Sequence, residues 1–151
     1  MDNFEKTPYE TNPVESLADA VKAFVEAYDV LQSTLAEFDD EKIFSAALRT
    51  AMYQPVVPSG CDNPPICLYE IGVVFSPDEE KYTINNRKLL VNLHSRESDV
   101  RALFIQENDG ILSHLCEILC AFLGNDELNE FVHAAVLRFL NECRRLFAMW
   151  E

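Results

Sequence analysis

The chain has 151 residues, the length of one ordinary domain, and its hydrophobic content of 48% is enough for a buried core without metal ions or disulfides. Its 26 acidic and 12 basic residues give a net charge of −14, which argues against binding to a nucleic-acid backbone or to an anionic membrane surface. A protein partner, including a basic one, is compatible with this charge.

The cysteines and histidines are the residues that would bind a metal ion or act as nucleophiles. Cys116 and Cys120 are one helical turn apart among leucines, which predicts buried thiols, whereas Cys61 lies in a proline-rich segment and is the candidate for an exposed thiol. His133 falls on an apolar helix, where it is expected at the edge of the core. The cysteine spacings match no common zinc class, and motifs for phosphate binding or hydrolysis are missing. We therefore expect no catalytic site, no metal ion and no cofactor.

The location of the protein is predicted from its cysteines and its N-terminus. An odd number of cysteines, five, follows an acidic, polar N-terminus that does not resemble a signal peptide. This combination predicts reduced thiols and a cytoplasmic or nuclear protein. No apolar segment approaches the length of a membrane span, so we expect no membrane association.

The chain divides into a short arm and one domain. Residues 1–12 are polar and predict a flexible N-terminal arm, which leaves residues 13–151 as a single helical domain. Within this domain we expect an N-terminal helical hairpin (13–53), a proline-rich loop (54–65) and a helical stack (66–151).

A long helix is predicted from Val14 to Phe38, because large apolar residues recur at alternating intervals of four and three. These residues are Leu17, Val21, Phe24, Tyr28, Leu31, Leu35 and Phe38. They form an apolar seam along one side of the helix. The seam would either pack on its own domain or contact a second copy of the chain, and in the second case the protein is a self-assembling homodimer. A second helix from Glu41 to Tyr53, capped by Asp39 or Asp40, completes the predicted hairpin.

The segment from Ile66 to Phe75 is ambiguous. Its β-branched and aromatic residues favour a strand, which would form a small β-hairpin with Lys88 to Leu93, but a short buried helix is an alternative. The sequence Ser76-Pro77-Asp78-Glu79 is typical of a helix start, and we therefore predict a helix from Pro77 to His94.

Three more helices are expected in the last third of the chain. Ser98 would cap one that ends at Gln106, a second spans Ile111 to Phe122, and a third, capped by Asn125 or Asp126, reaches the C-terminus. The predicted fold class is all-α: a helical bundle or a short helical stack with an N-terminal helical hairpin.

The second half of the chain contains Leu90-Val91-Asn92-Leu93, which matches the Leu-x-Asn-Leu signature of the third helix of an armadillo repeat. Residues 77–150 accordingly resemble an armadillo/HEAT-like α-solenoid. The segments 100–110, 111–123 and 131–143 resemble the first, second and third helices of the following repeat. Phe139-Leu140-Asn141-Glu142 then stands at the signature position and departs from it at Glu142.

The resemblance implies a partner-binding surface. Members of this family bind extended peptides along a groove of third helices, whose asparagines bond to the backbone of the partner. The resemblance assigns this role to Asn92 and Asn141. An equal alternative is that these asparagines cap the local backbone. The other residues of the predicted surface are Arg87, Lys88, Arg138, Phe147 and Trp150, of which the last two would contact either the core or a partner.

The first functional hypothesis is a non-enzymatic adaptor or scaffold that binds a protein partner through a helical surface or groove. One alternative is the self-assembling structural or regulatory protein that uses the helix over residues 14–38. Another is a pathogen-encoded helical bundle that sequesters a host factor. The last is an enzyme or a zinc protein with an unrecognised site.

Overall fold

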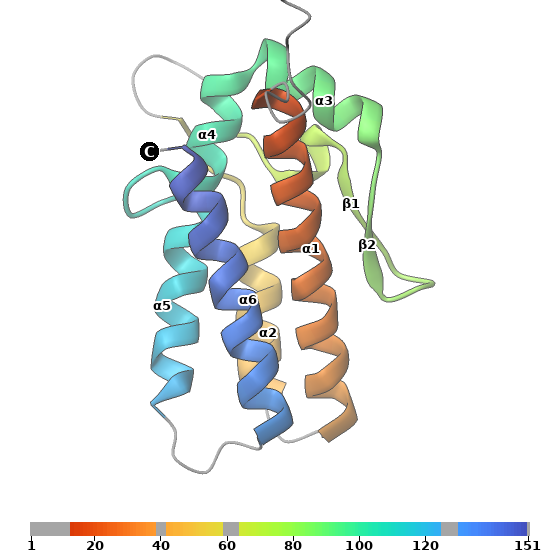
Figure 1. The fold of residues 1–151 in the computed structure, drawn as a ribbon, viewed down its shortest axis with the longest axis vertical. Helices are drawn as coiled ribbons and strands as arrows, with labels where there is room; N and C mark the ends of the chain where they lie inside the picture. Colours follow the sequence, from red (N-terminus) through yellow and green to blue (C-terminus); the bar gives the residue numbers. More distant parts are fainter. Residues whose placement is uncertain (1–12, 39–41, 59–63, 125–129, 151) are drawn as a thin grey trace, which may run out of the picture.

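The computed structural model describes residues 13–38, 42–58, 64–124 and 130–150. Its fold is mainly α-helical with one small β-hairpin, which confirms the predicted fold class (Figure 1). The elements in chain order are α1 (Pro13–Phe38), α2 (Lys42–Tyr53), a short 3-10 helix η2 (Leu68–Ile71), β1 (Val73–Ser76), β2 (Lys81–Ile84), α3 (Asn86–Ser95), α4 (Glu97–Ile105), α5 (Ile111–Leu123) and α6 (Glu130–Met149).

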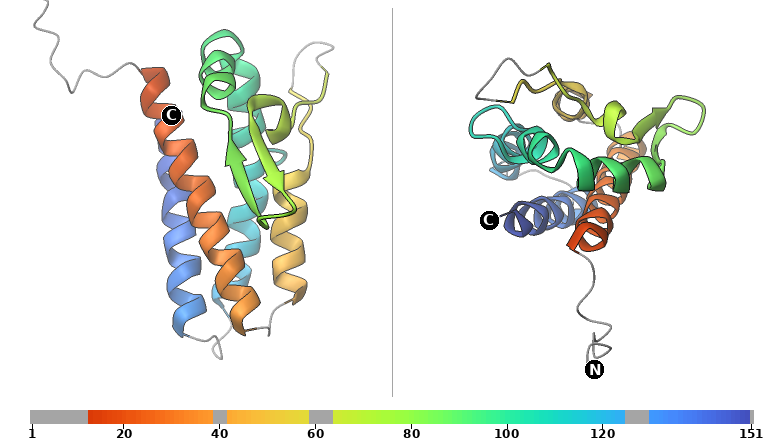
Figure 2. Two further views of the ribbon diagram at one scale, coloured as in Figure 1. Left: turned by 90° about the vertical axis from the view of Figure 1, so that its right-hand side faces the viewer. Right: turned by 90° about the horizontal axis from the view of Figure 1, so that it is seen from above.

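Four helices, α1, α2, α5 and α6, run side by side and form a bundle, while α3 and α4 lie across one end of it (Figure 1). Helix α6 packs along α1, and α5 packs against both α6 and α2. The side between α1 and α2 is the most loosely packed of the four, and the β-hairpin lies over it (Figure 2). This arrangement leaves one partly open side in an otherwise closed bundle.

The predicted apolar seam of α1 forms the centre of the core. Every seam residue from Leu17 to Leu35 is buried, whereas the side chain of Phe38 lies outside the described residues. The ring of Phe24 stacks on Phe139 of α6 at a centroid distance of 5.3 Å and meets Phe104 of α4 edge-on at 5.8 Å. The seam thus packs on its own domain, and a homodimer would have to use another surface.

The prediction for residues 66–94 is wrong in two respects. The strand β1 pairs with β2, not with Lys88 to Leu93, and the register joins Phe75 to Tyr82 in an antiparallel hairpin. No helix begins at Pro77: the tetrapeptide after β1 is a turn in which Glu80 has a φ of 55°. The helix cap is instead Asn85, whose side chain accepts a hydrogen bond from the Lys88 amide at 3.1 Å.

Gly72 explains why the hairpin begins where it does. It closes η2 with a φ of 93°, a conformation that glycine adopts without strain. Its carbonyl accepts a hydrogen bond of 2.8 Å from the Asn85 amide, and a Cβ at this position would lie 2.9 Å from the Asn85 carbonyl oxygen. A left-handed residue is therefore required where the chain turns from η2 into the hairpin.

Several other boundaries differ from the prediction. Ser98 does not cap α4, which begins at Glu97 after Arg96. Helix α3, which carries the Leu-x-Asn-Leu signature, has 10 residues and is shorter than the helix expected there. The resemblance to an α-solenoid stays a prediction. The proposed caps at positions 12, 39, 40, 125 and 126 lie outside the described residues.

Trp150 belongs to the core. Only 7% of its surface is exposed, and its ring stacks on Phe104 at a centroid distance of 5.5 Å. The backbone carbonyl of Trp150 accepts a hydrogen bond from Arg101 at 3.5 Å, whereas the buried indole Nε1 has no hydrogen-bond partner within the described structure. These contacts join the end of α6 to α4.

We predict that Trp150→Ala lowers the free energy of unfolding by about 3 kcal/mol, because it removes a large buried ring and leaves a cavity. Urea unfolding followed by far-ultraviolet circular dichroism measures the change. The control is Phe147→Ala in the last turn of α6: the Phe147 side chain is 37% exposed, so its removal should cost much less. Equal losses in the two variants would contradict the assignment of Trp150 to the core.

Candidate functional site

A hollow of about 1310 Å³ opens where the β-hairpin lies over α1 and α2. We call it the α1–α2–hairpin groove. Most of its lining residues belong to α1, several belong to the hairpin, and α2 contributes Ser45 and Arg49. The polar, charged and large apolar residues that line it include Asp19, Lys22, Glu26, Tyr28, Asp29, Val30, Gln32, Ser33, Ser45, Arg49, Phe75, Glu79, Glu80, Lys81 and Tyr82.

A hydrogen-bond network between α1 and α2 lies in this groove. Gln32 Nε2 donates to the Tyr28 hydroxyl at 3.0 Å and to the Ser45 backbone carbonyl at 3.1 Å. The Ser45 hydroxyl donates in return to Gln32 Oε1, and Arg49 donates to the same hydroxyl oxygen at 3.4 Å. Burial raises the pKa of Tyr28 to about 12, so its hydroxyl stays protonated at neutral pH. The network therefore holds the two helices in a fixed arrangement.

The hairpin is anchored to α1 through Tyr82. Its ring packs on Tyr28 at a centroid distance of 5.6 Å and on Phe75, its cross-strand neighbour, at 5.4 Å. Its backbone amide donates to both carboxylate oxygens of Asp29, at 3.2 and 3.3 Å. Because β2 is an edge strand, this amide would otherwise have no partner in the sheet. Asp29 thus fixes the position of β2 above α1.

The Asp29 carboxyl is only half-buried, and burial raises its pKa to about 6. The amide of Tyr82 and the charge of Lys81 oppose this rise, while the charge of Glu26 adds to it. None of the ion pairs found among the described residues involves Asp29. The groove therefore contains a partly desolvated carboxyl that has no ion-pair partner among the residues that the structure describes.

The groove combines negative charge with exposed apolar surface. Among its lining residues are five carboxylates, against the three cations Lys22, Arg49 and Lys81. Phe75 and Val30 also line it, and each is 38% exposed. A concave surface with apolar contacts and a few fixed polar groups is suited to binding a ligand.

The thiols of Cys116 and Cys143 are not activated as nucleophiles. Burial raises the pKa of Cys116 and, to a greater extent, that of Cys143, so both thiols stay protonated at neutral pH. A nucleophilic cysteine has a lowered pKa instead. Cys120 and His133 are exposed, which corrects the predictions of a buried thiol and a core-edge histidine, since both point away from the packed faces of α5 and α6. Cys61 lies outside the described residues.

A metal centre is likewise not found in the part of the chain that the structure describes. No group of three or more histidine, cysteine, aspartate or glutamate side chains is placed there to hold an ion.

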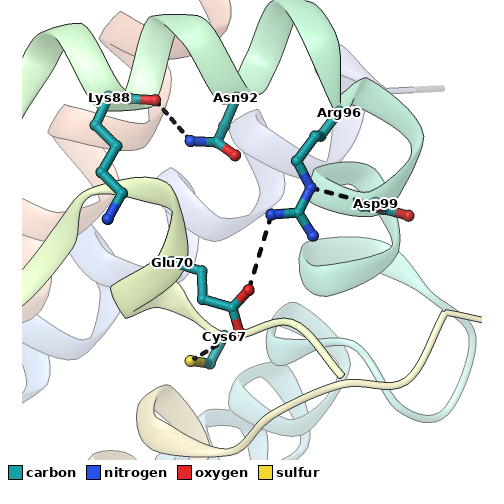
Figure 3. Close-up of polar contacts among 6 residues, drawn as sticks. All are labelled: Cys67, Glu70, Lys88, Asn92, Arg96 and Asp99. Atoms are coloured by element: carbon teal, nitrogen blue, oxygen red, sulfur yellow. Dashed lines mark hydrogen bonds and ion pairs between the residues drawn. The ribbon is translucent and has the colours of Figure 1, made fainter. Parts of the chain in front are cut away.

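The predicted partner-binding residues of α3 have local contacts. Asn92 is 8% exposed, and its side chain donates to the Lys88 carbonyl at 2.8 Å, so it bonds within its own helix (Figure 3). The Lys88 ammonium lies 5.3 Å from the centre of the Tyr69 ring. Arg87 and Lys88 are exposed. In this structure Asn92 has the local-backbone role that was the alternative to a groove contact.

A second set of polar contacts joins η2 to the corner between α3 and α4. Arg96 lies 3.8 Å from a carboxylate oxygen of Glu70 and 3.4 Å from one of Asp99 (Figure 3). Cys67 Sγ lies 3.9 Å from the other Glu70 oxygen. These partly exposed contacts orient η2, from which the hairpin starts.

The remaining predicted residues lie on or just after α6. Arg138 and Asn141 are exposed, and Arg138 pairs with Glu26 of α1 at 4.0 Å. Phe147 is 37% exposed, while Trp150 is buried as described above. The α3 residues and the α6 residues belong to two helices that each pack on α1. Neither set lines the α1–α2–hairpin groove.

The groove is not predicted by the sequence patterns. Asp29 lies within the helix predicted from Val14 to Phe38, and Tyr82 lies within the helix predicted from Pro77 to His94, where the structure has a strand. The available signal was local: an acidic residue directly after Tyr28, at a point where the apolar seam is regular. That signal does not indicate which segment the acid contacts.

Comparisons with protein-family models, with curated proteins and with solved structures find no match. A search of the described helices for one both long and apolar enough to cross a membrane also finds none.

We predict that Asp29→Asn changes how stability depends on pH. The folded-state pKa of about 6 exceeds the ordinary value of 3.8, so the native state binds the proton more tightly than the unfolded state between these values. This carboxyl therefore lowers the free energy of unfolding as pH rises through that window. Asparagine retains an oxygen that accepts from the Tyr82 amide but carries no charge.

Urea unfolding at about pH 4 and about pH 7 tests this prediction. The free energy of unfolding of the variant minus that of the wild type should be about 1 kcal/mol larger at pH 7 than at pH 4. This value is smaller than the full pKa shift implies, because solvent screens a half-exposed group. Asp19→Asn, on the exposed face of the same helix, is the matched control. A variant that is less stable than the wild type by the same amount at both pH values would contradict the prediction.

Proposed function

We propose that the protein is a non-enzymatic interaction module that binds a segment of another protein in the α1–α2–hairpin groove. The observation that carries this proposal is the groove itself: a hollow of about 1310 Å³ between fixed walls, with carboxylates and exposed apolar side chains along it. An adaptor and a protein that sequesters a host factor would both act by such binding.

The contacts around the groove favour binding because they hold its walls in place before a partner arrives. Gln32 and Ser45 link α1 to α2, and Tyr82 links the hairpin to α1. A surface that is already ordered loses little conformational entropy on binding. The apolar surfaces of Phe75 and Val30 then remain available for burial against a partner, which is favourable at roughly 25 cal/mol per Å².

The other surfaces considered above offer less. The apolar seam of α1 is buried in the core, so self-assembly through this seam would compete with folding. Asn92 and Trp150 are also buried. The exposed face of α6 around Arg138 and Asn141 is the remaining alternative, and the same experiment tests it.

The test is a selection of random displayed peptides on the immobilised full-length chain, followed by affinity measurements with two variants. Ser33→Trp places a large side chain in the groove, and Asn141→Trp places the same side chain on the exposed face of α6. Both positions are exposed on long helices, so both variants should fold, which circular dichroism verifies.

We expect the selected peptides to bind Ser33→Trp at least about tenfold more weakly than the wild type, a loss of about 1.4 kcal/mol, and to bind Asn141→Trp unchanged. Failure of the selection to enrich any peptide contradicts the proposal. So does the reverse pattern, which would transfer the binding surface to α6.

A further inference from the structure

Resting on the proposed function, we propose that the groove selects a partner segment with a lysine or arginine beside an apolar side chain. The cation would bind the carboxylate of Asp29, and the apolar side chain would pack on Phe75.

Asp29 has bonding capacity that the described residues do not fill. An ionised carboxylate has about four acceptor sites on its two oxygens, and both oxygens here share one donor, the amide of Tyr82. The side chain is only half-buried and lines the groove, so its remaining acceptor sites can be reached from the groove. A charged donor would form a charge-assisted hydrogen bond there, which is about twice as strong as a neutral one.

The surrounding charges favour a cation over an anion. The titratable and charged groups that line the groove with Asp29 are Asp19, Lys22, Glu26 and Tyr28 of α1, Arg49 of α2, Glu79 and Glu80 of the turn, and Lys81 and Tyr82 of β2. Both tyrosines are protonated at neutral pH, because burial raises their pKa values. Glu26 is already paired with Arg138 of α6, and the four other carboxylates of the groove, Asp29 included, outnumber its three cations.

The apolar requirement follows from the neighbours of Asp29. Phe75 packs on the ring of Tyr82, the residue whose amide Asp29 holds, and keeps 38% of its surface exposed. Val30 follows Asp29 in the chain and is exposed to the same extent. A lysine would bring its apolar stem across these side chains, and an arginine would also stack on the aromatic ring.

This mode of binding predicts that a proton leaves when the partner binds. Burial raises the pKa of Asp29 to about 6, so in the free protein the carboxyl is about half protonated at that pH. A cation beside it favours the charged form and lowers the pKa again. The proton that Asp29 carried is then released to the solvent.

The probe is a synthetic peptide with the sequence enriched in the selection on the wild-type chain. Its control is the same peptide with the cation replaced by a neutral residue of similar shape, norleucine for lysine or citrulline for arginine. Isothermal titration calorimetry at about pH 6 in two buffers of different ionisation enthalpy counts the protons that are released.

We expect enriched peptides to carry lysine or arginine and the control peptide to bind about tenfold more weakly. The wild type should release about half a proton at pH 6, in line with the Asp29 pKa of about 6, and almost none at about pH 8. Asp29→Asn should bind both peptides equally and release none, while Glu117→Gln on the exposed face of α5 should behave as the wild type.

The outcomes separate this inference from the proposed function. Peptides that bind in the groove, as shown by their loss with Ser33→Trp, but that lack cations or bind Asp29→Asn unchanged would overturn the inference alone. Peptides that are insensitive to Ser33→Trp would overturn the proposed function and the inference with it.

Discussion

Tyr82 attaches the β-hairpin to α1 by two contacts of different kinds, and the groove depends on them. Its ring packs against Tyr28, and its amide donates to the Asp29 carboxylate. A two-stranded hairpin is marginally stable alone in water, so its position must come from what it packs on. Without these contacts the hairpin would lose its attachment to α1, and the hairpin residues that line the groove, Phe75 among them, would not be held in place.

The same attachment creates a conflict at Asp29. The carboxyl is desolvated by the hairpin that it holds, and its raised pKa expresses that cost. One backbone amide compensates only part of the desolvation, because a carboxylate has more acceptor sites than this donor fills. Functional sites often retain such uncompensated groups, since an incoming ligand can satisfy them. In this account the stability that is lost in the free protein is regained when a cation of the partner binds.

The sequence allowed the helices of the bundle to be predicted because their signals are local. The alternating intervals of four and three in α1 predict its length and its buried face, and the structure confirms both up to Leu35. The second strand of the hairpin was placed wrongly for a physical reason: Pro77-Asp78-Glu79 after a serine suits a tight turn as well as a helix start. The left-handed Gly72 and the pairing of Phe75 with Tyr82 favour the turn over the helix start. The pairing is a contact between two strands, which a local sequence pattern does not reveal.

The groove was beyond reach of sequence patterns for a related reason. Its residues come from α1, α2 and the hairpin, and each of them has an ordinary role in its own segment. Ser45 and Arg49 are typical of the exposed side of a helix, and Asp29 is typical of a charged helical face. Their assembly into one groove depends on how the three segments pack. The hydrogen bond of Asn92 within its own helix is likewise visible only in the structure.

Hydrogen exchange at the Tyr82 amide, followed by nuclear magnetic resonance, tests the central claim most directly. If Asp29 holds this outward-facing amide of an edge strand, its exchange in the wild type should be at least about tenfold slower than in Asp29→Ala, which corresponds to about 1.4 kcal/mol of protection. Exchange in the wild type at the rate of an unstructured peptide would contradict the account, because the hairpin would then not be held against α1.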